Sequence, residues 1–354
     1  MTTLYFRGKA VKLITAKLVL AVGMVGVLGC GGSPEQRLNG GGSSFVYPMM
    51  SKWAGEYDKA KGVKINYQSI GSGGGIQQMT AKTLDFGCTD APMNDEQLAK
   101  ARETGGDVVH IPLVMGAAVA IYNLDEAKEA LQFTGTVLAD IFLGKIKKWN
   151  DQALKTLNPK ANLPDKEISV VHRSDGSGTT HIWVDYLSKV SEEWKTKVGV
   201  GTSVNWPCGV GQKGSEGVSG HVKRSAGSIG YVELTYALQN NIQFGLVENK
   251  EGVFVKAGID SVTEAAKGAL SEIPNDLRYS ITNAPGKDAY PISGTVWAVI
   301  YVKQPSDKGK AVVDFLRWVA HEGQRYAGDL HYAPLPPGLI ERLDKKLDQV
   351  QVAK

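Results

Sequence analysis

The stretch Val170-Val-His-Arg-Ser-Asp-Gly-Ser-Gly-Thr-Thr180 places a strand, a glycine-rich turn and the start of a helix in succession. The apolar run 168–171 predicts the strand, and apolar residues spaced four apart over 180–190 predict the helix. The free N–H groups of such a turn and the positive end of the helix dipole attract anions. Arg173 adds a planar fork of donors at the same place. The stretch therefore predicts a binding site for phosphate or a similar oxyanion.

The rest of the chain alternates strand and helix patterns, which is typical of an α/β architecture with sheets covered by helices. Its 354 residues suffice for two domains, and 42% hydrophobic with 21% charged residues is the composition of a folded protein. The apolar run 108–122 predicts two buried strands that are broken at Pro112. Further strands are expected at 63–67, 84–87, 229–233 and 296–302, and further helices at 48–59, 76–82, 95–103, 136–143, 151–157 and 308–321.

The first 29 residues have the features of a targeting segment. Four cations come before or at the edge of the apolar stretch 18–29, which is too short to cross a bilayer comfortably. The stretch runs into Val27-Leu-Gly-Cys30, which resembles the lipobox of bacterial lipoproteins and implies that Cys30 is acylated as the first mature residue. A simple secretion signal or an uncleaved anchor is the alternative. Residues 30–42 are predicted to be a flexible tether of glycine, serine, proline and polar residues.

The charge balance argues against a nucleic-acid ligand, and the spacing of cysteine and histidine argues against a metal ion. The chain has 40 Lys+Arg and 36 Asp+Glu, and removal of residues 1–29 takes away four cations and no acid, so the mature chain is formally neutral. Such a balance lacks the basic pattern of a nucleic-acid-binding protein. Cysteine and histidine do not cluster at metal-ligand spacings. Cys88 and Cys208 could pair in an oxidising compartment, but two buried free thiols are favoured.

Four segments share one design, since each places a small donor or a carboxylate at the end of a predicted strand or the start of a predicted helix. In open α/β sheets that edge is where ligands bind. Each segment alone has a plainer interpretation: a turn, a helix cap or a solvated loop residue. The glycine run 71–75 lacks the Lys-Ser/Thr ending of a nucleotide-binding loop and the acidic residue of a dinucleotide site. The four segments are Gly40-Gly-Gly-Ser-Ser-Phe45, Gly71-Ser-Gly-Gly-Gly75, Asp90 and Arg173-Ser-Asp-Gly-Ser-Gly-Thr179.

Taken together, these segments resemble the periplasmic phosphate-binding proteins of bacterial phosphate-specific ABC transporters. The resemblance begins near Gly40, continues almost to the C-terminus, and depends on six motifs in the same order and spacing. They are Ser44-Phe45, Ile70-Gly-Ser-Gly-Gly-Gly75, Asp85-Phe-Gly-Cys-Thr-Asp-Ala-Pro92, Leu143-Gly-Lys-Ile-Lys-Lys-Trp-Asn150, Arg173-Ser-Asp-Gly-Ser-Gly-Thr179 and Gly230-Tyr-Val-Glu233.

The resemblance implies a two-lobed periplasmic-binding-protein fold, in which each lobe is a mixed α/β sheet flanked by helices and the ligand lies in the interlobe cleft. Residues 43–123 with 290–354 are expected to form the first, discontinuous lobe, and residues 124–289 the second. The lobes of this family close over the ligand by hinge bending, which removes water from the ion and strengthens each contact.

The resemblance also implies a role for each site residue. Asp90 would accept a proton from phosphate, Arg173 would be the cation that touches it, and Asp175 would hold Arg173 in place. The remaining ligands would donate hydroxyl or backbone hydrogen bonds, and they are Ser44, Phe45, Ser72, Ser177, Gly178 and Thr179. No cofactor, metal or enzymatic activity is expected. The expected partners are inorganic phosphate and permease subunits in the inner membrane, and the chain is expected to be a monomer in the periplasm or at the cell surface, anchored through Cys30.

Three alternatives stay open at this stage. A receptor for sulfate or molybdate is disfavoured by Asp90, because a fully deprotonated oxyanion would meet a carboxylate with like charge. A secreted phosphate-ester hydrolase could use serine with His172 and Asp175, but Ser177 does not lie in a Gly-x-Ser-x-Gly elbow. A phosphate sensor or surface adhesin with the same fold is the third alternative.

Overall fold

The computed structural model describes residues 36–353. The predicted signal segment and the lipidation of Cys30 lie outside the described residues. Within the described part, no helix combines the length and apolar character that a membrane crossing needs.

The long buried strand β4 (Val108–Tyr122) organises a nine-stranded sheet in the order β2-β1-β3-β12-β4-β8-β6-β7, with β9 also paired to β4. Up to Ala117 it pairs antiparallel with β12 (Ser293–Tyr301), and from Ala118 onward with β8 (Ser228–Glu233). The prediction of two strands broken at Pro112 is wrong. Pro112 lies opposite Trp297, where the register shifts at a β-bulge, and a bulge accommodates a residue that lacks an N–H donor.

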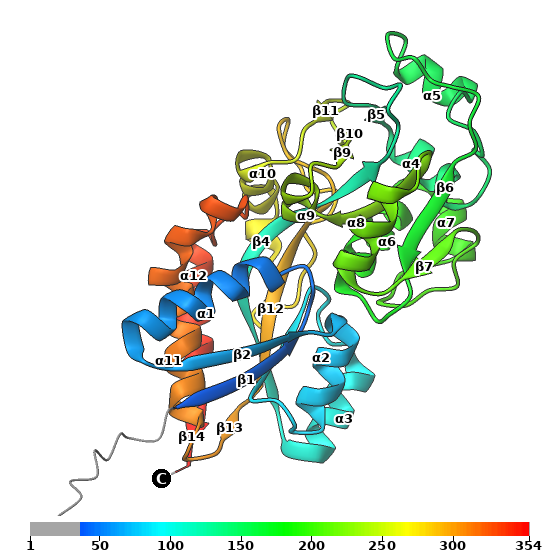
Figure 1. Cartoon of the computed structure of the whole chain (residues 1–354). Helices are drawn as coiled ribbons and strands as arrows, with labels where there is room; N and C mark the ends of the chain where they lie inside the picture. Colours follow the sequence, from blue (N-terminus) through cyan, green and yellow to red (C-terminus); the bar gives the residue numbers. More distant parts are fainter. Residues whose placement is uncertain (1–35, 354) are drawn as a thin grey trace, which may run out of the picture. The chain divides into compact units, whose positions relative to one another are not determined.

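One set of elements gathers along the first part of β4 (Figure 1). In this set, β1 (Arg37–Gly42) pairs in parallel with both β2 (Lys64–Ser69) and β3 (Phe86–Thr89). The other edge of β3 pairs antiparallel with β12. The helices of this set are α1 (Tyr47–Lys61), α2 (Gly71–Thr80), α3 (Asp95–Gly105), α11 (Gly309–Ala320) and α12 (Pro337–Leu347). The predicted start of α3 is confirmed, because Asn94 and Gln97 form a reciprocal capping box.

The predicted tether is wrong for Arg37–Gly42, because these residues form β1 inside the sheet. A Cβ atom at Gly40 would lie 2.2 Å from the Phe86 ring, and one at Gly42 would lie 2.1 Å from the Cys88 carbonyl oxygen. The glycines therefore permit close packing of neighbouring backbones and do not mark flexibility.

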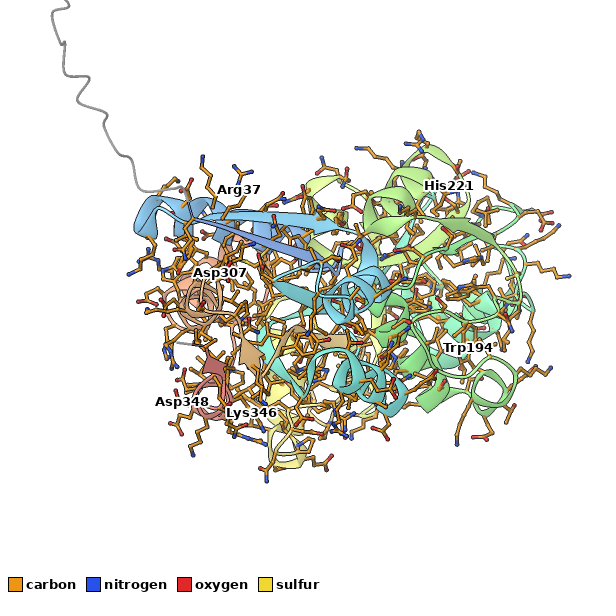
Figure 2. The ribbon with its side chains drawn as sticks, turned by 90° about the horizontal axis from the view of Figure 1, so that it is seen from below. Arg37, Trp194, His221, Asp307, Lys346 and Asp348 are labelled. Atoms are coloured by element: carbon orange, nitrogen blue, oxygen red, sulfur yellow. The ribbon has the colours of Figure 1, made fainter. Side chains whose placement is uncertain are left out.

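A second set of elements continues from the other part of β4 (Figure 1). Here β6 (Ser169–Arg173) pairs in parallel with both β8 and β7 (Val210–Gln212). The helices of this set are α4 (Gly135–Phe142), α5 (Gln152–Leu157), α6 (Gly178–Val190), α7 (Glu192–Lys197), α8 (Gly214–Arg224), α9 (Leu234–Gln239) and α10 (Ile259–Ala269). In Figure 2, Trp194 of α7 and His221 of α8 lie on the side opposite Arg37 of β1 and Asp307.

Short elements complete the described chain. A small sheet joins β5 (Gln132–Phe133), β10 (Leu246–Glu248) and β11 (Phe254–Val255), while β9 (Gln243–Phe244) pairs with β4. The strands β13 (Lys303–Gln304) and β14 (Gln351–Val352) pair near the C-terminus. Three 3₁₀ turns are η1 (Leu270–Glu272), η2 (Glu322–Tyr326) and η3 (Gly328–Leu330). Cys88 and Cys208 are both free thiols, as favoured from the sequence, but Cys88 alone of the two is buried and Cys208 is half-buried.

Candidate anion-binding site

All eight predicted ligand residues are buried and come from strand ends and helix starts that meet in one region. The segment 43–45 follows β1, Asp90 follows β3, and Arg173 ends β6. The first turns of α2 and α6 supply the others. Parallel strands β1 and β3 present their carboxyl ends at the same edge of a sheet, so a loop that follows each of them can converge on one point. The buried residues are Ser44, Phe45, Ser72, Asp90, Arg173, Ser177, Gly178 and Thr179.

Arg173 is held in a fixed orientation. Its Nε donates to Asp175 Oδ1 at 2.7 Å, its Nη2 donates to Asp175 Oδ2 at 2.6 Å, and its Nη1 donates to Ser44 Oγ at 3.0 Å. Burial alone would raise the pKa of Asp175, but the Arg173 hydrogen bond and charge lower the pKa below its ordinary value. The carboxylate thus stays ionised, and its charge balances most of the buried guanidinium charge.

The start of α6 is packed against Ser72 and Asp90. The Asp90 N–H donates to Ser72 Oγ at 3.2 Å. A Cβ atom at Gly178 would lie 2.5 Å from Ser72 Oγ and 2.6 Å from both Asp90 Cβ and N, so only glycine fits at this position. Close by, the N–H of Gly73 donates to the carbonyl of Gly176 at 2.9 Å, which joins the two glycine-rich loops directly.

Asp90 is the most unusual group of the site. It is 2% exposed, and its Oδ1 has no hydrogen-bond partner within residues 36–353. Burial raises the pKa of Asp90 to about 7, against the opposing effects of a hydrogen bond from Ser43 and the charge of Arg173. Thr179 Oγ1 is likewise buried without a partner among these residues. One acceptor and one hydroxyl in this region therefore have hydrogen-bonding capacity that the protein itself does not use.

Ser177 acts as the N-cap of α6. Its Oγ accepts from the Thr180 N–H at 3.1 Å, and its own N–H donates to the Thr202 carbonyl at 2.8 Å. A capping serine uses its oxygen as the acceptor and keeps its hydroxyl proton available for donation. Capping and ligand donation are therefore compatible at this residue.

Ser215 at the start of α8 was not among the predicted ligands, although it lies in direct contact with two of them. Its Oγ is 2.9 Å from Ser44 Oγ and 3.5 Å from Arg173 Nη1, and its N–H donates to Ser44 Oγ at 3.3 Å. The sequence carries a signal for it, because Gly214-Ser215 opens α8 as Gly71-Ser72 opens α2. Tyr236, whose hydroxyl donates to the Ser44 carbonyl at 2.7 Å, has no comparable signal in the sequence.

His172 faces away from the ligand residues. Its ring stacks on Trp206 with the centroids 4.7 Å apart, and its Nδ1 is 3.0 Å from the Arg173 carbonyl. The described residues also contain no cluster of three or more side chains suited to hold a metal ion. The convergent donors around Arg173, and the Asp90 oxygen that has no partner among residues 36–353, fit an oxyanion that carries a proton.

Comparison with known proteins relates this arrangement to one family. A family model described as a PBP superfamily domain matches residues 31–322. The phosphate-binding protein PstS of Xylella fastidiosa is 48% identical over 311 residues, which are 87% of this chain and 84% of that protein. PstS of Pasteurella multocida is 47% identical, with 87% and 89% covered. PstS of Methanocaldococcus jannaschii is 37% identical, with 97% and 96% covered.

Solved structures show the same fold. A phosphate-binding protein from Stenotrophomonas maltophilia aligns with a TM-score of 0.65 at 19% identity, covering 88% of this chain and 93% of that one. The periplasmic phosphate-binding protein PfluDING, solved with bound phosphate, aligns with a TM-score of 0.72 at 19% identity, with 88% and 93% covered. The predicted two-lobed periplasmic-binding fold is confirmed by these matches together with the family model.

Proposed function

Because this chain belongs to the phosphate-binding proteins of the PBP superfamily, we propose that it binds inorganic phosphate with high affinity outside the cytoplasm and delivers it to the permease of an ABC transporter. Two observations carry the proposal: the buried oxygen of Asp90, which has no hydrogen-bond partner among residues 36–353, and the fixed guanidinium of Arg173, whose charge acts on Asp90.

Asp90 explains how phosphate would be told apart from sulfate. Phosphate near neutral pH still carries a proton, which an ionised Asp90 can accept in a short, charge-assisted hydrogen bond. Sulfate carries no proton, so the same carboxylate would face only lone pairs of like charge. Selectivity then comes from a repulsive element directed against the wrong ligand.

Neutral dipoles supply most of the remaining recognition, because the charge of Arg173 is already balanced by Asp175. We assign hydroxyl donation to Ser44, Ser72, Ser177 and Thr179, and backbone N–H donation to Phe45, Ser72 and the α6 start at Gly178. Burial in a low-dielectric region strengthens each of these hydrogen bonds. Thr179 Oγ1 has no partner in the described part of the chain, which supports this assignment for its hydroxyl.

For the lobes we propose residues 43–123 with 290–354 as one and residues 124–289 as the other, with β1 added to the first. Along β4 the partner strand changes from β12 to β8 between Ala117 and Ala118. This change supports the proposal that the chain passes from one lobe to the other near β4. The Asn123 side chain, which donates to the carbonyls of Val222 and Lys223, would fix the first connection on the second lobe. Phosphate would lie between these lobes.

A receptor is better supported than a hydrolase. The oxygen of Ser177 accepts the capping hydrogen bond of α6, and His172, the base considered for a hydrolase, stacks on Trp206 and not on this hydroxyl. A serine nucleophile needs a general base within hydrogen-bond reach. A sulfate or molybdate receptor is the second candidate, and the Asp90 carboxylate counts against it.

Isothermal titration of the purified mature protein with phosphate, sulfate and molybdate tests the proposal. We expect tight binding of phosphate and at least about a thousandfold weaker binding of the other two ions, because a site built on specific hydrogen bonds rejects ligands that leave a partner unpaired. Equal or stronger binding of sulfate or molybdate would overturn it. Arg173→Ala should weaken phosphate binding by roughly 2–5 kcal/mol, as for one side of a buried charge pair.

We further propose that the protein is a monomer of the periplasm or cell surface, held to a membrane by the lipidated Cys30. The support is the lipobox-like sequence before this residue. Cys30→Ala should move the protein from the membrane to the soluble fraction of cells, and retention of this variant in the membrane fraction would contradict lipid anchoring.

A further inference from the structure

The backbone at Ser44 and Phe45 is held by two buried tyrosines from different parts of the chain. Tyr332, which follows η3, donates to the Phe45 carbonyl at 2.6 Å. Tyr236 of α9 donates to the Ser44 carbonyl at 2.7 Å. With the lobes proposed above, Tyr332 lies in the same lobe as its partner, whereas Tyr236 reaches across from the other lobe. Only the Tyr236 hydrogen bond would therefore depend on lobe closure.

The Tyr236 hydrogen bond acts on a peptide group of the proposed binding site. The Ser44 carbonyl and the Phe45 N–H belong to the same peptide unit, and this N–H is one of the proposed phosphate donors. A hydrogen bond accepted at the carbonyl polarises the peptide and strengthens donation from its N–H. The other hydrogen bond to this carbonyl, from the Tyr47 N–H, is long at 3.3 Å. The hydroxyl of Tyr236 is thus the main partner of this oxygen.

A second acceptor competes for the same proton. Glu216 Oε1, in the first turn of α8, lies 3.0 Å from the Tyr236 hydroxyl and accepts from Ser69 Oγ at 3.2 Å. A phenol has one proton to donate. Burial raises the pKa of Tyr236 far above its ordinary value, with the charge of Glu216 acting in the same direction, so the hydroxyl keeps that proton. The proton goes either to the Ser44 carbonyl or to the exposed carboxylate.

We propose that Tyr236 is a positioning residue that couples lobe closure to phosphate affinity through the Ser44–Phe45 peptide, and that Glu216 weakens this coupling by competing for its proton. The inference rests on the proposed phosphate-binding function. Tyr236 contacts no atom of the ion in this mechanism. It stabilises the closed form and strengthens one donor, so its loss should appear in the rate of phosphate release.

The test compares Tyr236→Phe with Tyr301→Phe as a matched control. Both are buried tyrosines whose hydroxyls donate to a backbone carbonyl, and Tyr301 bonds to Thr80 at 2.9 Å, outside the ligand residues. Stopped-flow measurements should show that Tyr236→Phe raises the phosphate off-rate about five- to tenfold with little change in the on-rate. Tyr301→Phe should change neither rate, although both variants should lower the melting temperature. Unchanged off-rates in Tyr236→Phe, or equal changes in both variants, would overturn the inference.

A double-mutant cycle with Glu216→Gln tests the competition. The uncharged amide is a weaker acceptor for Tyr236 but keeps an oxygen for the hydrogen bond from Ser69. Glu216→Gln should therefore lower the off-rate about two- to threefold in the wild-type background, and leave it unchanged or raise it in Tyr236→Phe. The same effect in both backgrounds would contradict the role of Glu216. If the wild-type protein bound no phosphate, the proposed function would be wrong. If the wild type bound phosphate and Tyr236→Phe had the same off-rate, only the proposed role of Tyr236 would be wrong.

Discussion

Asp90 has a carboxylate oxygen that is buried and without a partner in the described part of the chain. Asp90→Asn keeps the shape of the side chain and removes its charge, and the new amide can donate to a deprotonated oxyanion. We therefore expect sulfate affinity to rise about tenfold or more while phosphate affinity falls. Competition titrations of both ions against the variant and the wild type measure this change. An unaltered phosphate-to-sulfate ratio would refute the proton-acceptor role.

The pH dependence of selectivity gives a second check on this residue. Burial raises the pKa of Asp90 to about 7 in the phosphate-free protein, so the acid gains a proton as the pH falls below that value. A protonated Asp90 no longer repels sulfate and can donate to it. Selectivity for phosphate should therefore increase from about pH 6 to about pH 8 in the wild type and change less in Asp90→Asn. A flat wild-type profile would contradict this expectation.

Short motifs identified most of the residues that the structure gathers around Arg173, because their chemistry is visible in the local sequence. The sequence placed Arg173 beside Asp175, and the structure has this pair in bidentate contact. It missed Ser215 and Tyr236, since their roles depend on which distant backbone they reach. Ser44 and Tyr236 are 192 positions apart in the chain, and no local pattern indicates such a contact.

At the scale of elements, most predicted strands and helices are present, and the differences concern glycine and proline. The glycines of 71–75 were expected to form a turn, yet they form the first half of α2. Their low helix propensity is outweighed by packing, because a Cβ atom at Gly75 would lie 2.6 Å from Gly42 Cα. Similarly, close packing explains β1, and a bulge within β4 itself, next to Pro112, explains the continuity of this strand. These effects depend on contacts between residues far apart in the sequence, so the local sequence does not predict them.

The close packing of Gly178, at the start of α6, against Ser72 and Asp90 allows a prediction. Gly178→Ala places a methyl group 2.5 Å from Ser72 Oγ, so the helix start must move away from Ser72 and Asp90. Displacement of a positioned donor group is costly for binding, and we expect the phosphate dissociation constant to rise about tenfold or more. Calorimetric titration measures the effect.

Gly338→Ala is the matched control for this change. Gly338 also lies in the first turn of a helix, α12. Apart from its chain neighbours and the backbone of its own helix, no described atom lies within 4 Å of the place that its new methyl group would take. This variant should bind phosphate normally and gain about 0.5–1 kcal/mol of stability from its better helix propensity. Normal phosphate binding by Gly178→Ala would show that α6 does not need this close approach.

At the scale of the whole molecule, three buried ionisable groups link stability to pH in opposite directions. Burial, together with the charge of Arg278, lowers the pKa of His110 to about 4, so stability is lost as the pH falls from 6.5 toward 4. Burial raises the pKa of Asp90 to about 7 and that of Glu233 to about 8. For these acids the native state keeps a proton that the unfolded chain releases, so stability is lost as the pH rises toward their native pKa values.

Glu233 can be separated from the other two groups by the choice of pH window. Above about pH 7 His110 is largely neutral in both states, and Asp90 contributes little further change because its native pKa is about 7. Between about pH 7 and pH 8 the free energy of unfolding of the phosphate-free protein should therefore fall by about 1 kcal/mol through Glu233, at 1.36 kcal/mol per pKa unit. Glu233→Gln retains an acceptor for the Thr235 N–H, which Oε2 engages at 2.7 Å, but cannot ionise. Urea unfolding should give a flatter profile for this variant, and an equally steep decline in both proteins would show that Glu233 is not the source of the pH dependence.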